Sequence, residues 1–335
     1  MPEGAGRRSQ SVDAHLYLLV TMALFGSAFA SSKAVVGHMP HQVAAFLRFG
    51  GGAVILLVIL AFITSRSARG GKLTGKQIAR AAAVGLIGVF AYNLFFFWGL
   101  SLAPSADGSI IVPVLSPVLT TLFLLITRRE TASARRMCGL GIGLAGAVVF
   151  FLGAGGVGSD VDSTRLAGDF VFLLGAASWA TYSIASKKVL VGMDPLRATT
   201  YGTAAGALGL LLLALPFLPD VEWSGTPGHT WANVVYLAVG PTAVAYLFYY
   251  RGLRVVSPST ATVVMFTVPV FGVTCAVVFL GESITGLQLV GAVVMLAGAL
   301  LAVTQKRLPE NARGKAAPDA DAAHPNDEPQ SLTKG

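Results

Sequence analysis

Long apolar runs constrain this chain more than any other feature. Four of them, Val54–Thr64, Val114–Ile126, Leu208–Phe217 and Leu289–Val303, are free of charged residues. Only 12% of the 335 residues are charged, whereas soluble domains carry about 25%. So few charges could not cover a water-exposed surface. Because roughly 18 or more mostly apolar residues can cross a bilayer core, we expect an all-α integral membrane protein.

Ten segments have the length and composition of transmembrane helices. The first five are expected at Leu16–Val35, Val43–Thr64, Ile78–Leu100, Asp107–Thr127 and Met137–Gly153. The second five are expected at Leu166–Lys188, Ala198–Leu218, Thr230–Arg251, Ser259–Leu280 and Gly286–Thr304. Residues 1–15 and 306–335 are expected to be solvated tails. The second tail is rich in Ala, Pro, Asp and Asn, so we expect it to be disordered.

The basic residues predict an orientation, because cytoplasmic loops collect Lys and Arg. They precede the first span and then fill every second connection, while the alternate connections contain only Arg165. Both tails are therefore expected on the cytoplasmic side, which requires an even number of spans. The net charge of +8 is then explained by orientation and contact with anionic lipid rather than by nucleic-acid binding.

The two halves of the chain repeat one another. NLFFFWGL at Asn93–Leu100 corresponds to YLFYYRGL at Tyr246–Leu253. Glu130–Ala147 and Glu282–Ala299 are identical at six of eighteen positions without a gap. We therefore expect two five-helix repeats, residues 16–153 and 166–305, joined by a linker at 154–165. An odd number of spans forces the second copy to enter the membrane upside down, and inverted repeats are typical of secondary transporters.

Several motifs resemble the EamA family of the drug/metabolite transporter superfamily. They are LFGSAFASSK at Leu24–Lys33, FLRF at Phe46–Phe49, the proline-bearing fourth span, and GES with GLQLVGAVVMLAGALLA at Gly281–Ala302. One departure is Phe25, where the family often has Trp, although Trp179 takes the matching place in the sixth span. The resemblance implies a ten-helix exporter or exchanger of small metabolites in a bacterial cytoplasmic (inner) membrane.

Polar and aromatic residues within the spans are the candidate substrate-binding residues, because polar groups in hydrocarbon are costly. Arg48 either attracts an anionic group, pairs with Asp107 or extends to the interface. The aromatic residues either line a central pocket or take part in ordinary helix packing. The candidates are Arg48, Tyr92, Asn93, Trp179, Tyr182, Tyr246 and Tyr249.

Other residues are candidates for coupling and for shaping the helices. Asp107 is a possible charge partner or proton carrier, or it lies in the outer interface. Pro113, Pro117 and Pro269 are expected to kink their spans, either as gating joints or only to shape the bundle. Small residues such as Gly139 favour close approach of helices.

These observations predict a secondary active transporter that exports or exchanges small organic metabolites, amino acids or related amphipathic compounds, by alternating access. Multidrug efflux and passive facilitation are the alternatives, and a membrane scaffold or an intramembrane enzyme is less favoured. The sequence has no Walker-type loop and no HExxH motif, so we expect no enzymatic activity, no cofactor and no metal. The expected partners are a small-molecule substrate, the lipid bilayer and a coupling proton or counter-substrate, but no nucleic acid.

Overall fold

The expected spans form helices. The computed structural model describes residues 3–66, 74–127, 133–154, 162–253 and 264–303, and no strand occurs in these ranges. The helices of the first half are α1 (Glu3–Val36), α2 (His41–Arg66), α3 (Gly75–Gly85), η1 (Leu86–Ala91), α4 (Tyr92–Leu102), α5 (Ser105–Ile126) and α6 (Ala134–Ala154). Those of the second half are α7 (Ser163–Val189), α8 (Pro195–Ala214), η2 (Leu215–Phe217), α9 (Gly228–Leu237), η3 (Ala238–Val244), α10 (Ala245–Leu253), α12 (Val268–Leu280) and α13 (Gly286–Val303).

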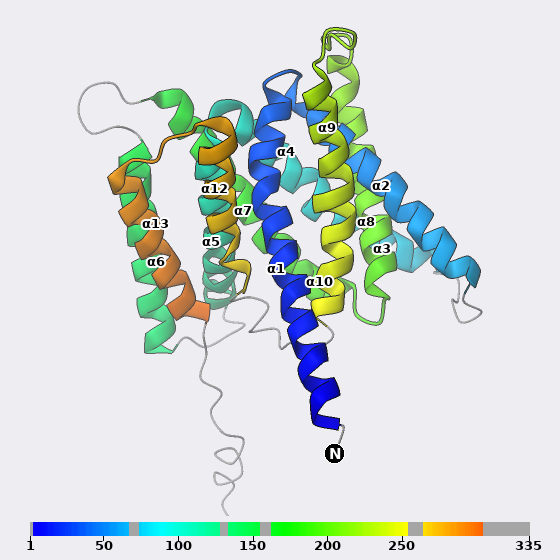
Figure 1. Ribbon diagram of the computed structural model, residues 1–335. Coiled ribbons are helices and arrows are strands. Elements are labelled where there is room, and N and C mark those ends of the chain that lie inside the picture. Colours follow the sequence, from blue (N-terminus) through cyan, green and yellow to red (C-terminus); the bar gives the residue numbers. More distant parts are fainter. Residues whose placement is uncertain (1–2, 67–73, 128–132, 155–161, 254–263, 304–335) are drawn as a thin grey trace, which may run out of the picture. The chain divides into compact units, whose positions relative to one another are not determined.

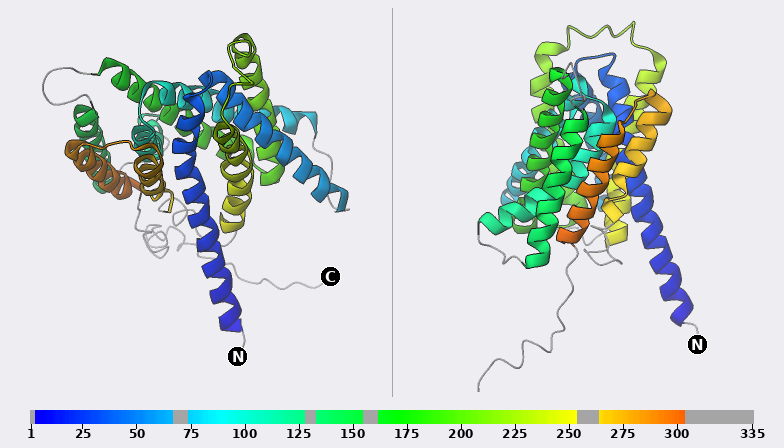
Figure 2. Two further views of the ribbon diagram at one scale, coloured as in Figure 1. Left: turned by 45° about the horizontal axis from the view of Figure 1, so that its top comes forward. Right: turned by 90° about the vertical axis from the view of Figure 1, so that its left-hand side faces the viewer.

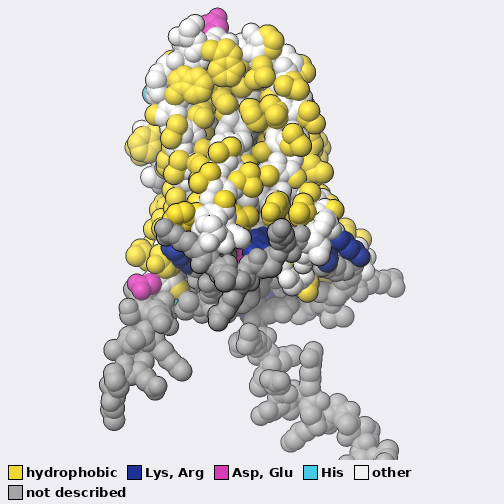
Figure 3. All heavy atoms as spheres, turned by 90° about the vertical axis from the view of Figure 1, so that its right-hand side faces the viewer, with side chains coloured by type: hydrophobic (Ala, Val, Ile, Leu, Met, Phe, Trp, Pro, Cys, Tyr) yellow, Lys and Arg dark blue, Asp and Glu magenta, His cyan; other side chains and the backbone are white. Residues whose placement is uncertain are grey.

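The length and surface of these helices confirm an all-α membrane protein. Within the described residues, seven helices are long and apolar enough to cross a bilayer, and α12 and α13 are shorter apolar helices. The sixth expected span is α7, which has 27 residues and carries Asp169 near its start. Apolar side chains cover the face seen in Figure 3, and Lys and Arg side chains gather at its lower end. This distribution suits a helix bundle surrounded by lipid.

The packing of the helices follows the inverted repeat (Figures 1 and 2). α1 packs against α12, and its counterpart α7 packs against α5. α1 also packs against α9 and α10, as α7 does against α3 and α4. Three pairs combine a helix with its own counterpart, namely α2 with α8, α5 with α12 and α6 with α13. Exchanging the two halves maps these particular contacts onto one another, as a pseudo-two-fold axis requires.

The α6–α13 pair shows the same relation at the level of atoms. A Cβ added to Gly139 would meet the backbone of Ala302 and Gly298. A Cβ added to Gly291, which aligns with Gly139, would meet the backbone of Phe150 and Gly146. Small residues thus bring the two helices into backbone contact along one face.

Two turns of π-helix were not expected from the sequence. η1 interrupts the third span between α3 and α4, and η3 interrupts the eighth span between α9 and α10. They occupy corresponding positions in the two halves, and η3 contains Pro241. Such turns occur mostly as single insertions within α-helices and often lie at functional sites.

Some expectations need correction. α1 begins at Glu3, so the first helix starts before the expected span and includes most of the segment 1–15 that we expect to be a solvated tail. Pro113 and Pro117 lie inside α5, which runs from Ser105 to Ile126, and the expected kinks at these two positions stay a prediction. The ninth span is interrupted by a turn at residues 266–267, and Pro269 lies in the first turn of α12, where proline is tolerated. The expected C-terminal tail and most of the linker lie outside the described residues.

Candidate functional site

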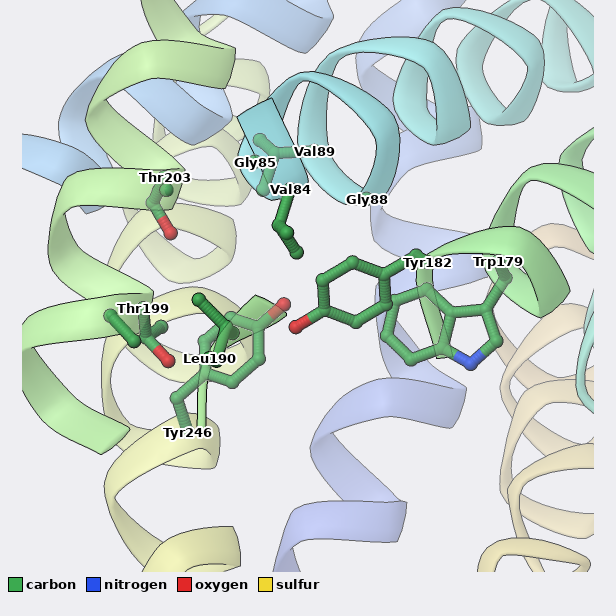
Figure 4. A pocket seen from close by; sticks show the side chains of 12 residues that line it. Val84, Gly85, Gly88, Val89, Trp179, Tyr182, Leu190, Thr199, Thr203 and Tyr246 are labelled. Carbon is green, nitrogen blue, oxygen red and sulfur yellow. The ribbon is translucent and has the colours of Figure 1, made fainter. Parts of the chain in front are cut away.

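A pocket lies between helices of both halves. The third span contributes Val84, Gly85, Gly88 and Val89 to its walls, and α7 contributes Trp179 and Tyr182, with Leu190 directly after the helix. The remaining wall residues are Ala198, Thr199, Gly202 and Thr203 of α8 and Tyr246 of α10. Its empty volume, including the open mouth, is about 370 Å³. The side chains of Tyr182 and Tyr246 extend into this space, with Thr199 and Thr203 on the α8 side (Figure 4). Leu190 and Ala198 place the pocket toward the end of the helical unit where α7 ends and α8 begins.

A row of aromatic rings continues from the pocket into the bundle. Trp179 lies between Tyr182 and Tyr92, with ring centroids 5.3 Å and 5.1 Å away. Tyr92 in turn lies 5.8 Å from Phe96, and Tyr246 contacts Phe25 at 6.0 Å. Three of the expected substrate-binding residues therefore line the pocket, namely Trp179, Tyr182 and Tyr246. A fourth, Tyr92, packs against Trp179. Offset and tilted rings of this kind form a rigid apolar wall with hydroxyl groups at its edges.

Arg48 of α2 is buried beside this row, with a relative exposure of 7%. Its guanidinium lies over the rings of Phe49 and Phe96, at 4.8 Å and 5.5 Å from their centroids. One nitrogen, Nη1, donates to the hydroxyl of Ser32 at 3.4 Å, while Nε has no hydrogen-bond partner. No carboxylate among the described residues pairs with Arg48. The result is a buried cation held by π faces, with unused hydrogen-bond donors.

The surroundings of Arg48 suit an anionic group. The hydroxyl-bearing side chains of Tyr92, Tyr236 and Tyr246 lie within electrostatic range of the guanidinium. Tyr246 also lines the pocket, whereas Arg48 is not one of the residues of its walls. A buried cation without a counter-ion is costly, so a ligand carboxylate or phosphate would satisfy this site.

Asn93 has a local role. Its side chain is 1% exposed and donates from Nδ2 to the carbonyl oxygen of Val89 at 2.8 Å. Val89 belongs to η1, whose widened turn leaves carbonyl groups that need donors. Ser178 of α7 likewise donates to Ile87 of η1 at 3.0 Å. Asn93 therefore stabilises the η1 wall of the pocket without lining the pocket itself. Its Oδ1 has no hydrogen-bond partner among the described residues.

Two further candidates are placed differently from the expectations. Tyr249 is partly buried near Met265, and it does not line the pocket. Asp107 is 1% exposed and lies in the first turn of α5, so its carboxylate is enclosed by protein. The suggested pair of Asp107 with Arg48 is wrong, because the Asp107 carboxylate instead accepts two hydrogen bonds from Arg165, at 2.7 and 2.9 Å.

Asp107 belongs to a polar network, which we define as Lys33, Asp107, Arg165, Asp169, Glu282 and Gln288. Gln288 of α13 donates to Asp107 at 2.9 Å. The Glu282 carboxylate accepts from the backbone amides of Ser105 and Ala106 at 2.9 and 2.8 Å, and so caps the start of α5. Lys33 donates to the carbonyl groups of Leu100 and Ala103 at the end of α4. The network connects α1, α4, α5, α7 and α13 at the end of the helical unit opposite the pocket mouth.

Sequence reasoning missed Asp169 and the glycine-lined wall of the pocket. Asp169 is 0% exposed on α7. The sequence feature that could have indicated Asp169 is an acidic residue inside an apolar run, four positions after an Arg. The sequence does not single out Gly88. Its role is seen only in the structure, where a Cβ at this position would overlap the ring of Tyr182.

The EamA-like transporter family matches the chain twice, over residues 13–152 and 166–304. An uncharacterized transporter of Bacillus subtilis, YyaM, is 27% identical over 295 residues, which cover 88% of this chain and 94% of the relative. The aromatic amino acid exporter YddG of Ancylobacter novellus is 28% identical over 289 residues, covering 86% and 96%.

A probable terminal-alkyne amino-acid exporter of Streptantibioticus cattleyicolor is 26% identical over 288 residues, which cover 85% of this chain and 91% of the relative. A crystal structure with 23% sequence identity superimposes with a TM-score of 0.57 and covers 88% of this chain and 95% of the other. At this identity the structural likeness shows a shared fold.

Proposed function

Because the chain belongs to the EamA-like transporter family, we propose that it is a secondary active transporter that exports or exchanges small organic metabolites. The leading substrate class is amino acids and related amphipathic carboxylates. Arg48 carries this proposal, since it is a buried cation with unused donors beside an aromatic wall. A guanidinium binds a carboxylate through two parallel hydrogen bonds, which gives both affinity and orientation.

The remainder of such a substrate would meet the aromatic residues. Trp179, Tyr182 and Tyr246 offer an apolar surface with a few hydroxyl groups, a combination typical of small-molecule sites. Two relatives named for amino-acid export, YddG and the terminal-alkyne amino-acid exporter, support the same class.

The inverted repeat supports alternating access as the mechanism. Two similar halves in opposite orientation can exchange conformations, so that the substrate site is exposed first at one face and then at the other. In the structure the pocket lies toward one end, and the polar network joins five helices at the other end. This arrangement is the one expected when one face is open and the opposite face is closed.

The test is transport by the purified protein in liposomes, with amino acids, their decarboxylated amines and apolar cationic drugs as substrates. We expect flux of at least one amino acid or amphipathic carboxylate. Flux of the drugs alone would replace the proposal by multidrug efflux, which is the second candidate because the pocket walls are mostly apolar.

Trp179→Ala is expected to lower the apparent affinity for the transported compound several-fold, because a ring contact contributes roughly 0.5–1.5 kcal/mol beyond its buried area. Trp98→Ala is the matched control, since Trp98 is 40% exposed and does not line the pocket. Equal affinity in both variants would remove Trp179 from the substrate site.

We also propose that both ends of the chain lie on the cytoplasmic side of a bacterial inner membrane, as the distribution of Lys and Arg favours. In a background with Cys138 and Cys275 replaced by Ala, Ser101→Cys should react with an impermeant maleimide in intact cells. Lys76→Cys should react only after permeabilisation. Both positions are exposed, at opposite ends of the third span. The reverse labelling pattern would invert the proposed orientation.

A further inference from the structure

The polar network contains a carboxyl group that the contacts described above leave unexplained. Asp169 of α7 is fully buried, and neither of its oxygens has a hydrogen-bond donor among the described residues. Another carboxyl group, that of Asp107, is its hydrogen-bonding neighbour, because Arg165, one helical turn before Asp169, binds the Asp107 carboxylate. Two ionised carboxylates cannot form such a bond, because both are acceptors only. A proton between them would make one a donor and the other its acceptor.

The hydrogen bonds of Asp107 favour Asp169 as the residue that carries the proton. Its two oxygens already accept three hydrogen bonds, two from Arg165 and one from Gln288. Donors of this kind, one of them charged, favour the ionised form of Asp107. Asp169 has no donor of its own, so its protonated form fits the site and donates its O–H to Asp107.

The charges that face this pair agree with one bound proton. Glu282 lies across from Asp107, between α12 and α13, and Lys33 reaches the same region from α1. Arg165 precedes Asp169 by one helical turn, and Asp162 is exposed at the start of α7. Leaving the exposed Asp162 aside, the carboxyl groups of Asp107, Asp169 and Glu282 face the two cations Lys33 and Arg165. One proton makes the group neutral. In the described ranges no cluster of three or more His, Cys, Asp or Glu residues is arranged to hold a metal ion.

We propose that Asp169, paired with Asp107, is a proton-binding site of this chain, and that its protonation accompanies substrate movement. The second part rests on the proposed transport function. When this end of the helical unit opens far enough for water to reach Asp169, the proton leaves its oxygen for that water, and a second negative charge forms beside Asp107 and competes for Arg165. This competition weakens the bonds that join α5 to α7 and α13, and so favours opening of this end of the helical unit.

Infrared spectroscopy of the purified protein tests the binding site without any transport assay. At neutral pH the wild-type protein should show the C=O stretch of a protonated carboxyl group. Asp169→Asn should abolish this band, and Asp162→Asn, an exposed change on the same helix, should retain it. A wild-type spectrum without the band, or an Asp169→Asn spectrum that retains it, would overturn the proposal.

A second variant covers the case in which Asp169→Asn does not fold. Asp107→Asn removes the carboxylate acceptor of the proposed O–H, so the band should shift or disappear. A band of unchanged frequency and intensity in Asp107→Asn would overturn the pairing of the two residues.

The coupling is tested in liposomes with an imposed proton gradient. The gradient should change the initial rate of wild-type and Asp162→Asn transport several-fold, and this dependence should be lost in Asp169→Asn. Gradient-independent wild-type transport would overturn the coupling while the infrared result still decides the binding site. Absence of any substrate flux would instead overturn the proposed function.

Discussion

Replacing Arg48 by Gln is expected to weaken binding of a carboxylate substrate about ten- to one-hundred-fold, because hydrogen bonds to charged groups contribute about 1.5–3 kcal/mol and about 1.4 kcal/mol corresponds to a factor of ten. The same change should not destabilise the protein. Arg48 has no carboxylate partner among the described residues, so its removal relieves the cost of a buried cation. Loss of function together with equal or higher thermal stability would identify a binding residue rather than a structural one.

A conservative substitution separates charge from geometry. Arg48→Lys keeps the positive charge but loses the planar pair of donors. Its affinity for the carboxylate should therefore fall between those of the wild type and Arg48→Gln. Tracer binding to detergent-solubilised protein measures these affinities, and thermal unfolding in the same detergent measures stability.

The decarboxylated amine of the same substrate provides the control ligand. Its affinity should be similar for the wild type and Arg48→Gln, because it lacks the group that Arg48 is proposed to bind. If acid and amine lose affinity by the same factor, Arg48 acts through the shape of the pocket and not through its charge. If Arg48→Gln binds the acid as tightly as the wild type, the carboxylate is not held here.

Much of the fold could be predicted because membrane helices have a strong one-dimensional signal. Runs such as Val43–Thr64 are apolar over a length that only a span requires, and α2 extends them by a few residues at each end. The π-turns have no comparable signal. η1 and η3 change the hydrogen-bond register by one residue without changing composition. They are recognised only in the structure, where they recur at matching positions of the two halves.

The candidate site was predictable in part, for a similar reason. Trp179 and Tyr182 share a helix face by spacing alone, and both line the pocket. The partner of Asp107 could not be predicted by spacing, because Arg165 and Gln288 come from distant helices that meet only in the folded bundle. Arg48 and Asp107 looked like a pair on charge alone, but α7 brings a different cation to Asp107.

Replacing Gly139 by Leu is expected to destabilise the protein strongly, whereas Gly141→Leu on the same helix should not. A Cβ at Gly139 would lie 2.5 Å from the backbone nitrogen of Ala302 and 2.9 Å from the carbonyl oxygen of Gly298. Backbone atoms cannot move to another rotamer as side-chain atoms can, so α6 and α13 would have to separate to make room for the Leu side chain. Overpacking typically costs about 1–3 kcal/mol, which lowers the melting temperature by roughly 1–4 °C in a chain of this size.

Gly141→Leu is the matched control, because it makes the same substitution on the same helix without the close contact to α13. Gly141 is exposed, and no atom lies within 4 Å of a Cβ built there. Leu at this position gains helix propensity and meets lipid, so stability should stay equal or rise by up to about 1 kcal/mol. Thermal unfolding and gel filtration in one detergent compare the two variants. Equal melting temperatures would show that α6 and α13 do not approach as closely as the structure has them.

The inverted repeat extends this prediction to the second half of the chain. Gly291 contacts the backbone of Phe150 and Gly146 as Gly139 contacts that of Ala302 and Gly298. Gly291→Leu should therefore lower the melting temperature by about as much as Gly139→Leu does. Both changes act on one interface, so the double variant should be less than additive, since the first Leu already separates the helices. A strong effect at one glycine and none at the other would mean that the two halves do not share this contact, and the pseudo-two-fold relation would fail at the α6–α13 interface.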